Sequence, residues 1–121
     1  QRPQGTQRAV PPSARAAGPG AATLSNFRSF EGQVVTFTGR VIKVLESRRG
    51  GDFAVMFEDK SWKHGFKLVF FKGALSAVGG PAYVRNLRGT TISVRGLIVN
   101  HSQFGYEIIV NDRRMVLRVD Q

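Results

Sequence analysis

The sequence predicts an all-β domain in which five strands form a small barrel. Two stretches, residues 35–42 and 92–98, alternate apolar and polar residues, as half-buried strands do. Each has a glycine in its middle, Gly39 and Gly96. A glycine inside a strand marks a bulge or a sharp coil, where a side chain would clash. Strands that tilt around a closed barrel need such bends, whereas a flat sheet does not.

The remaining elements follow from turn residues and from alternation. Gly50 and Gly51 permit positive φ and predict a turn after the first strand. Pro81 fits the first position of a helix and Gly89 fits its end, so a short helical region is expected between the third and fourth strands. The expected strands are residues 34–45, 53–57, 66–71, 90–99 and 106–110, followed by a short terminal strand at 115–119.

Residues 1–26 are expected to be a disordered basic arm or linker, and residues 27–121 the folded domain. The arm holds four of the five prolines and no acidic residue, and it has no apolar periodicity that would offset the entropy of ordering. Its three arginines leave two interpretations open. The arm is either an electrostatic tether to phosphate or only a linker.

The composition favours a polyanionic partner. The 121 residues carry a net charge of +10, which suits nucleic acid, acidic lipid surfaces or acidic proteins. The absence of cysteine excludes disulfides, thiolate zinc sites and cysteine nucleophiles. No apolar run is long enough for a membrane span. The chain begins at Gln1, so both a cytoplasmic protein and one exported after loss of a leader stay open.

The strand patterns resemble the OB-fold, the oligonucleotide/oligosaccharide-binding barrel with Greek-key topology. The resemblance lies in Val35-x-Phe37-x-Gly39-x-Val41 for strand one and Ile92-x-Val94-x-Gly96-x-Ile98 for strand four. The closing stretch, residues 106–110, is similar to strand five of nucleic-acid-binding OB domains, including the tRNA-anticodon-binding type. The resemblance implies a binding face on the outside of strands two and three, flanked by the loops that join strands one to two and four to five.

Alternation divides strands two and three into a core set and an outward set. The outward set contains Met56, Lys67 and Phe71, which would combine a cation with a ring for base stacking. Phe71 has the alternative of burial under the helix or the arm. Trp62 and Phe104, in two loops, either stack on bases or fold back to cap the end of the barrel. The complete predicted nucleic-acid-binding set is Arg40, Lys43, Arg48, Arg49, Met56, Trp62, Lys67, Phe71, Arg95 and Phe104.

Catalysis, metal binding and cofactor binding find little support in the sequence. His64 and His101 each stand alone, without the paired spacing of metal ligands. No nucleophile–base arrangement, phosphate-cradling loop with lysine or dinucleotide fingerprint is present. We therefore expect a binding protein rather than an enzyme, with no cofactor and no metal.

The expected function is binding of single-stranded DNA or RNA with low sequence specificity. Phosphate charge would supply most of the affinity and aromatic stacking the remainder. The alternative is a protein–protein or adaptor module, in an exported assembly or as a homo-oligomer, that uses the same exposed strands. Fold alone does not choose between them, because one fold hosts many functions.

Overall fold

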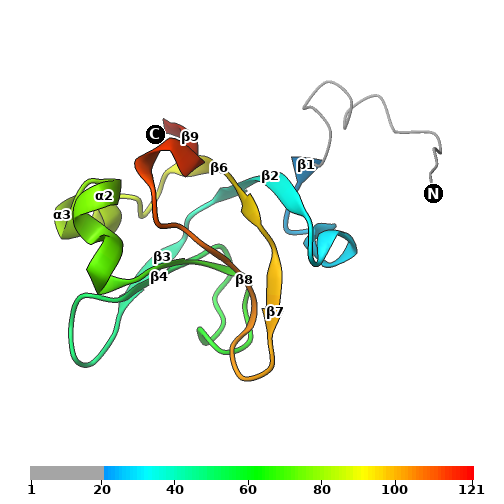
Figure 1. The fold of residues 1–121 in the computed structure, drawn as a ribbon, viewed down its shortest axis with the longest axis horizontal. Helices are drawn as coiled ribbons and strands as arrows, with labels where there is room; N and C mark the ends of the chain where they lie inside the picture. Colours follow the sequence, from blue (N-terminus) through cyan, green and yellow to red (C-terminus); the bar gives the residue numbers. More distant parts are fainter. Residues whose placement is uncertain (1–20) are drawn as a thin grey trace.

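The computed structural model describes residues 21–121, which form two β-sheets and a few short helices (Figure 1). The first sheet has the strand order β1-β2-β6-β9 and the second has the order β3-β4-β5-β8-β7. The prediction of an all-β fold is confirmed. The strands are β1 (Ala21–Ala22), β2 (Val34–Arg40), β3 (Lys43–Glu46), β4 (Phe53–Met56), β5 (Lys67–Phe70), β6 (Thr91–Leu97), β7 (Val99–His101), β8 (Gly105–Ile109) and β9 (Val116–Asp120).

Two long strands each run from one sheet into the other. Between β2 and β3, the Val41 amide donates to the Thr90 carbonyl (2.8 Å) and the Ile42 amide donates to the Met56 carbonyl (2.9 Å). Ile98 alone separates β6 from β7. The expected first and fourth strands are therefore present, but each bends and pairs with different partners in its two halves.

The pairings within the sheets are mostly antiparallel. β2 pairs with β6, and β4 lies between β3 and β5, all antiparallel. β5 pairs with β8 in parallel, and β8 pairs with β7 antiparallel. β9, the short terminal strand, pairs with β6 at the edge of the first sheet. This arrangement brings β8, late in the chain, beside β5.

The core contains the apolar residues that alternation assigned to it. Val35, Phe37 and Val41 are buried, as are the core-facing residues of β4 and β5. Phe37 is central, with its ring centroid 4.9 Å from that of Phe57 and 4.4 Å from that of Phe66. Such pairs contribute about 0.5–1.5 kcal/mol each beyond area burial, so this cluster holds the two sheets together.

Gly39 and Gly96 allow close approach rather than forming bulges. Both lie in regular register between β2 and β6. A Cβ at Gly39 would lie 2.8 Å from Cδ1 of Phe57, and one at Gly96 would lie 2.5 Å from Cγ2 of Ile108. The expected clash of a side chain at these two positions is confirmed. The irregularity lies elsewhere, between Ser93 and Val94, where the pairing of β6 with β9 shifts register.

The helical region lies between β5 and β6, as predicted. It consists of a 3-10 turn, Lys72–Ala74, followed by α2 (Leu75–Val78) and α3 (Pro81–Arg85). Gly79 and Gly80, with φ of 120° and 90°, separate the two helices. Within residues 21–121 no helix has the length and apolar character needed to cross a membrane.

The first part of the expected arm, residues 1–20, lies outside the described residues. Its remainder, residues 21–26, is part of the fold. Ala21–Ala22 pairs in parallel with β2, and Ala22 is buried. The Thr23 amide donates to Oδ1 of Asn26 (2.7 Å), which closes a turn before Phe27. Two small residues that join a sheet through their backbone leave no periodic pattern in the sequence. Composition therefore started the folded domain at residue 27, whereas the fold includes residues 21–26.

We predict that Gly39→Ala lowers the free energy of unfolding by about 1–3 kcal/mol, because its methyl group would overlap the rings of Phe57 and Phe37. Gly73→Ala is the matched control, since a Cβ there meets nothing within 4 Å. Urea denaturation of both variants measures the difference. Equal stability of the two variants would contradict the close-approach argument.

Candidate functional site

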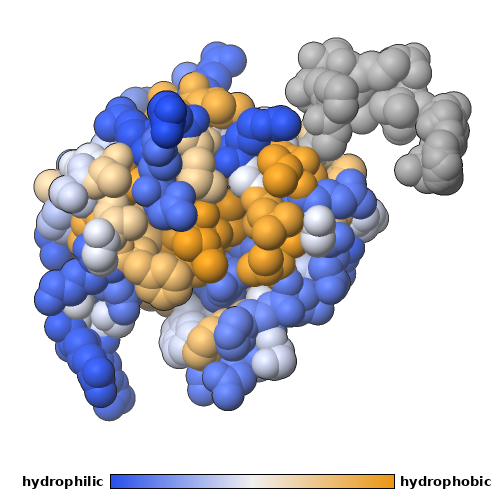
Figure 2. Space-filling view, in the orientation of Figure 1, coloured by the Kyte–Doolittle hydropathy of each residue, from blue (hydrophilic) through white to orange (hydrophobic). Residues whose placement is uncertain are grey.

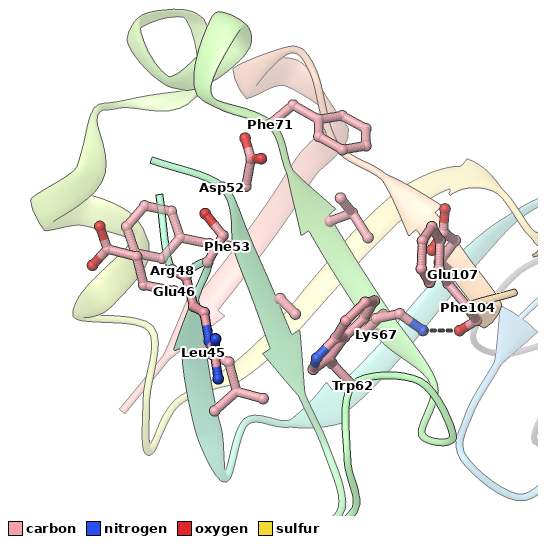
Figure 3. A pocket seen from close by; sticks show the side chains of 13 residues that line it. Leu45, Glu46, Arg48, Asp52, Phe53, Trp62, Lys67, Phe71, Phe104 and Glu107 are labelled. Atoms are coloured by element: carbon pink, nitrogen blue, oxygen red, sulfur yellow. Dashed lines mark hydrogen bonds between the residues drawn. The ribbon is translucent and has the colours of Figure 1, made fainter. Parts of the chain in front are cut away.

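A groove of about 450 Å³ lies on the outer face of the second sheet (Figure 3). Its floor follows the strand register, in which Leu45 of β3 pairs with Ala54 of β4, Ala54 with Val69 of β5, and Val69 with Ile109 of β8. Paired residues share one face of a sheet, so the floor is an apolar row across three strands, which continues beyond the groove to Ile109. The first three of these residues line the groove directly.

The structure brings five of the ten predicted residues into this groove. The groove is lined by Leu45, Glu46, Ser47, Arg48, Asp52, Phe53, Ala54, Trp62, Lys67, Val69, Phe71, Phe104 and Glu107. The five are Arg48, Trp62, Lys67, Phe71 and Phe104. The other five, Arg40, Lys43, Arg49, Met56 and Arg95, are not among the lining residues.

Lys67 belongs to the groove lining but is not exposed, which corrects the prediction of an outward lysine. Only 1% of its surface is accessible. Its Nζ donates to the Gly65 carbonyl (3.2 Å) and to the Phe104 carbonyl, the bond drawn in Figure 3. Burial lowers the pKa of Lys67, and the negative charge of Glu107 opposes this shift. Lys67 therefore joins two loops, and its ammonium has its partners within the protein.

Met56 is also buried, although alternation placed it on the outward face. None of its surface is accessible. The loop between β4 and β5 covers it, because Gly65 passes so close that a Cβ there would lie 2.6 Å from Cε of Met56. Alternation assigned Met56 and Lys67 to the correct face of the sheet, but a loop covers that part of the face.

One end of the groove is formed by two rings, Trp62 and Phe104, from the two loops that Lys67 joins, and His101 at the end of β7 stacks on Phe104. The ring centroids of Trp62 and Phe104 lie 5.0 Å apart, and those of Phe104 and His101 lie 4.5 Å apart and nearly parallel. Nζ of Lys63 lies 5.7 Å from the Trp62 ring. Trp62 remains 40% exposed. The indole therefore packs on Phe104 and still presents surface to solvent.

Phe71, the residue that follows β5, lies at the other end of the groove (Figure 3). It is 46% exposed, so burial under the helix is excluded. The side chain of Asp52 accepts a hydrogen bond from the Lys72 amide (2.7 Å), which ties the turn after β3 to the chain beside Phe71.

The groove lining does not carry the positive charge of the chain. It contains two cationic residues, Arg48 and Lys67, against three carboxylates. Glu46 accepts a hydrogen bond from Arg85 (3.1 Å), and this bond, followed by one from the Gly51 amide, lowers the pKa of Glu46. The rim of the groove therefore has a permanent carboxylate that is already partnered.

The other predicted cations lie outside the groove. Lys43 pairs with Asp59 (3.2 Å), and Arg49 is exposed in the turn beside Arg48. Arg40 is in β2 and Arg95 is in β6, so both belong to the first sheet. The positive residues predicted as one surface thus divide between two faces of the molecule.

The predicted binding set lacked the other eight residues that line the groove, which are Leu45, Glu46, Ser47, Asp52, Phe53, Ala54, Val69 and Glu107. The signal for Glu107 was available, because alternation in residues 106–110 puts Glu107 and Ile109 opposite the core residues. Its pairing with Lys67 across parallel strands required the tertiary structure. Among residues 21–121, no group of three or more His, Asp or Glu side chains is placed to hold a metal ion.

No family model and no curated protein matches the sequence. Comparison with solved structures finds similarity to a chain assigned as an aspartyl-tRNA synthetase from Leishmania major Friedlin, with 10% sequence identity and a TM-score of 0.49. The similarity covers 76% of this chain and 19% of that one, so this chain spans about a fifth of its length. A likeness of this size does not assign a family or a function.

We predict that Lys67→Met lowers the free energy of unfolding by about 1–3 kcal/mol, because it leaves the Gly65 and Phe104 carbonyls without their donor and removes the positive charge that interacts with the buried Glu107. Hydrogen exchange should also accelerate in residues 58–65 and 101–105. Lys63→Met, an exposed change in the same loop, is the control. Unchanged exchange in both loops would show that Lys67 does not join them.

Proposed function

We propose that the chain is an OB-fold barrel that binds single-stranded nucleic acid, DNA or RNA, with low sequence specificity and without catalysis. The order of strand pairing supports the fold. Within the second sheet, β3 pairs with β4, β4 with β5, β5 with β8 and β8 with β7. β2 leads into β3 and β6 leads into β7, and β2 and β6 pair with each other in the first sheet. This circuit is the one that a five-stranded barrel requires, with the short helices between its third and fourth strands.

The observation that carries the proposed function is a groove with an apolar floor and partly exposed rings at both ends. Phe71 and Trp62 are 46% and 40% exposed, and both line the groove. Bases stack on such rings at roughly 1–3 kcal/mol each, whatever their sequence. A duplex keeps its bases stacked on one another, so this groove favours a single strand.

Low sequence specificity follows from how the polar groups of the groove are used. Reading a base requires unpaired donors and acceptors that face its edge. The Lys67 ammonium bonds two carbonyls, Glu46 bonds Arg85, and Asp52 bonds the Lys72 amide. With these groups occupied by protein partners, stacking and shape are the main interactions left for a base.

The charge of the chain supports a polyanionic ligand. All eight carboxylates lie in residues 21–121, and subtracting the three arginines that precede residue 21 from the total of +10 leaves +7 for these residues. Arg48 lies on the groove and Arg49 beside it in an exposed turn. Both are positioned for phosphates that flank a stacked base.

An adaptor role is the second candidate, favoured by exposed apolar surface outside the groove. Figure 2 shows hydrophobic surface over β8 and over the β6–β7 strand, with hydrophilic surface around it. Leu97 of β6 is 45% exposed and Ile109 of β8 is 37% exposed. A protein partner or a second copy bound there would be retained at high salt, whereas binding to nucleic acid weakens steeply with salt.

We predict that Phe71→Ala weakens binding of a labelled single-stranded oligonucleotide by about 1–3 kcal/mol, roughly 5- to 150-fold, because one stacking ring is lost. Leu117→Ala is the matched control, since Leu117 is 53% exposed and lies outside the groove. Fluorescence anisotropy measures both affinities. Equal loss in the two variants, or none in either, would exclude Phe71 as a stacking platform.

Replacing Arg48 and Arg49 with Gln should make the dependence of log affinity on log salt shallower by up to about 1.4, if each contacts one phosphate of a single strand. The double variant Arg88→Gln, Arg113→Gln removes the same charge from exposed positions outside the groove and is the control. A salt series with one oligonucleotide gives both slopes. Absence of oligonucleotide binding by the wild-type protein at low salt would favour the adaptor role instead.

A further inference from the structure

The outer face of the first sheet carries three exposed arginines from three neighbouring strands. They are Arg40 of β2, Arg95 of β6 and Arg118 of β9. The register fixes their arrangement, because Thr36 pairs with Arg95, Thr38 with Ser93, and Ser93 in turn with Arg118. Arg95 and Arg118 therefore lie on the same face of neighbouring strands, on either side of the register shift between Ser93 and Val94. We call this surface, with Thr36, Thr38 and Ser93, the arginine face.

Few carboxylates compensate these charges. β2 and β6 contain no acidic residue. Asp120 of β9 pairs with Arg118 (2.6 Å) at one end of the face. Asp112, which borders a shallow hollow beside Arg95, is held by two hydrogen bonds from Arg114 (3.1 and 2.8 Å). The side-chain bond, followed by one from the Arg114 amide, lowers the pKa of Asp112 to about 2, so its carboxylate stays ionised and is paired with Arg114.

Hydroxyl side chains fill the space between the arginines. Thr38 and Ser93 hydrogen-bond each other across the two strands (2.8 Å), and Thr36 lies beside Arg95 in the same register. Arginine together with Ser and Thr is the usual set of side chains that contact phosphate oxygens in complexes with nucleic acid. An acidic protein partner would be expected to need an apolar centre in its contact, and the middle of this face is polar.

We infer that the arginine face is a second binding site, for the sugar–phosphate backbone of nucleic acid, on the opposite sheet from the groove. The inference rests on the proposed class of ligand but not on the groove. The groove lining has three carboxylates and two cations, so the positive potential of the domain lies outside it. A site that contacts only phosphates has no need of unstacked bases, and it accepts a duplex as well as a single strand.

The test uses the full chain and a blunt-ended DNA duplex of about 20 base pairs, whose stacked bases are inaccessible to the groove rings. We compare the wild type with the triple variant Arg40→Gln, Arg95→Gln, Arg118→Gln. The control triple variant, Arg28→Gln, Arg88→Gln, Arg113→Gln, removes the same charge from exposed positions outside the arginine face and the groove lining. Thermal midpoints first establish that both variants are folded.

For duplex DNA, loss of three phosphate contacts should make the slope of log affinity against log salt shallower by up to about 2.7, with a smaller change in the control. Phe71→Ala should leave duplex binding unchanged. If the two triple variants have the same slope, or if the wild type binds no duplex at low salt, the arginine face is overturned. If the wild type still binds single strands and Phe71→Ala weakens that binding, the groove proposal is retained. If the arginine-face variant weakens duplex binding but Phe71→Ala does not change single-strand binding, the groove proposal is overturned instead.

Discussion

The described fold depends on the close contact between two long strands and the core at Gly39 and Gly96. Each glycine lies where a neighbouring side chain, Phe57 or Ile108, occupies the space that a Cβ would take. Each of these strands continues a few residues beyond its glycine into the second sheet. The groove and the arginine face are the outer surfaces of the two sheets that these strands connect.

This connection separates two kinds of surface on one small domain. The second sheet presents an apolar floor between partly exposed rings, with charges that mostly have protein partners. The first sheet presents arginines and hydroxyls with few carboxylates. Under the two proposals, the apolar groove provides the stacking platform, with Arg48 and Arg49 beside it, and the arginine face provides further cations for phosphate contact.

Lys67 shows how a pattern can assign the correct face and the wrong environment. Alternation put it outward, and in register it does belong to the groove side of β5. Two loops then cover it, and it binds one carbonyl from each. A buried ammonium with partners costs little, whereas the same ammonium without them would be strongly unfavourable. The two loops and Lys67 therefore depend on one another, and the position of the Trp62–Phe104 pair depends on all three.

The sequence by itself determined the all-β class, the order of the main strands and helices and the core-facing residues, because alternation, glycines and turn residues act over a few neighbours, whereas the exposure of Phe71 was decided by the structure. Only the tertiary structure decided which strands pair, where the two bent strands change sheets, and which loops cover Met56 and Lys67. It also decided that Arg40 and Arg95 lie in the first sheet, whereas Arg48 lies in the turn between β3 and β4 of the second. These features arise from contacts between residues far apart in the chain, such as Lys67 with Phe104 and Thr38 with Ser93, which leave no local periodic signal.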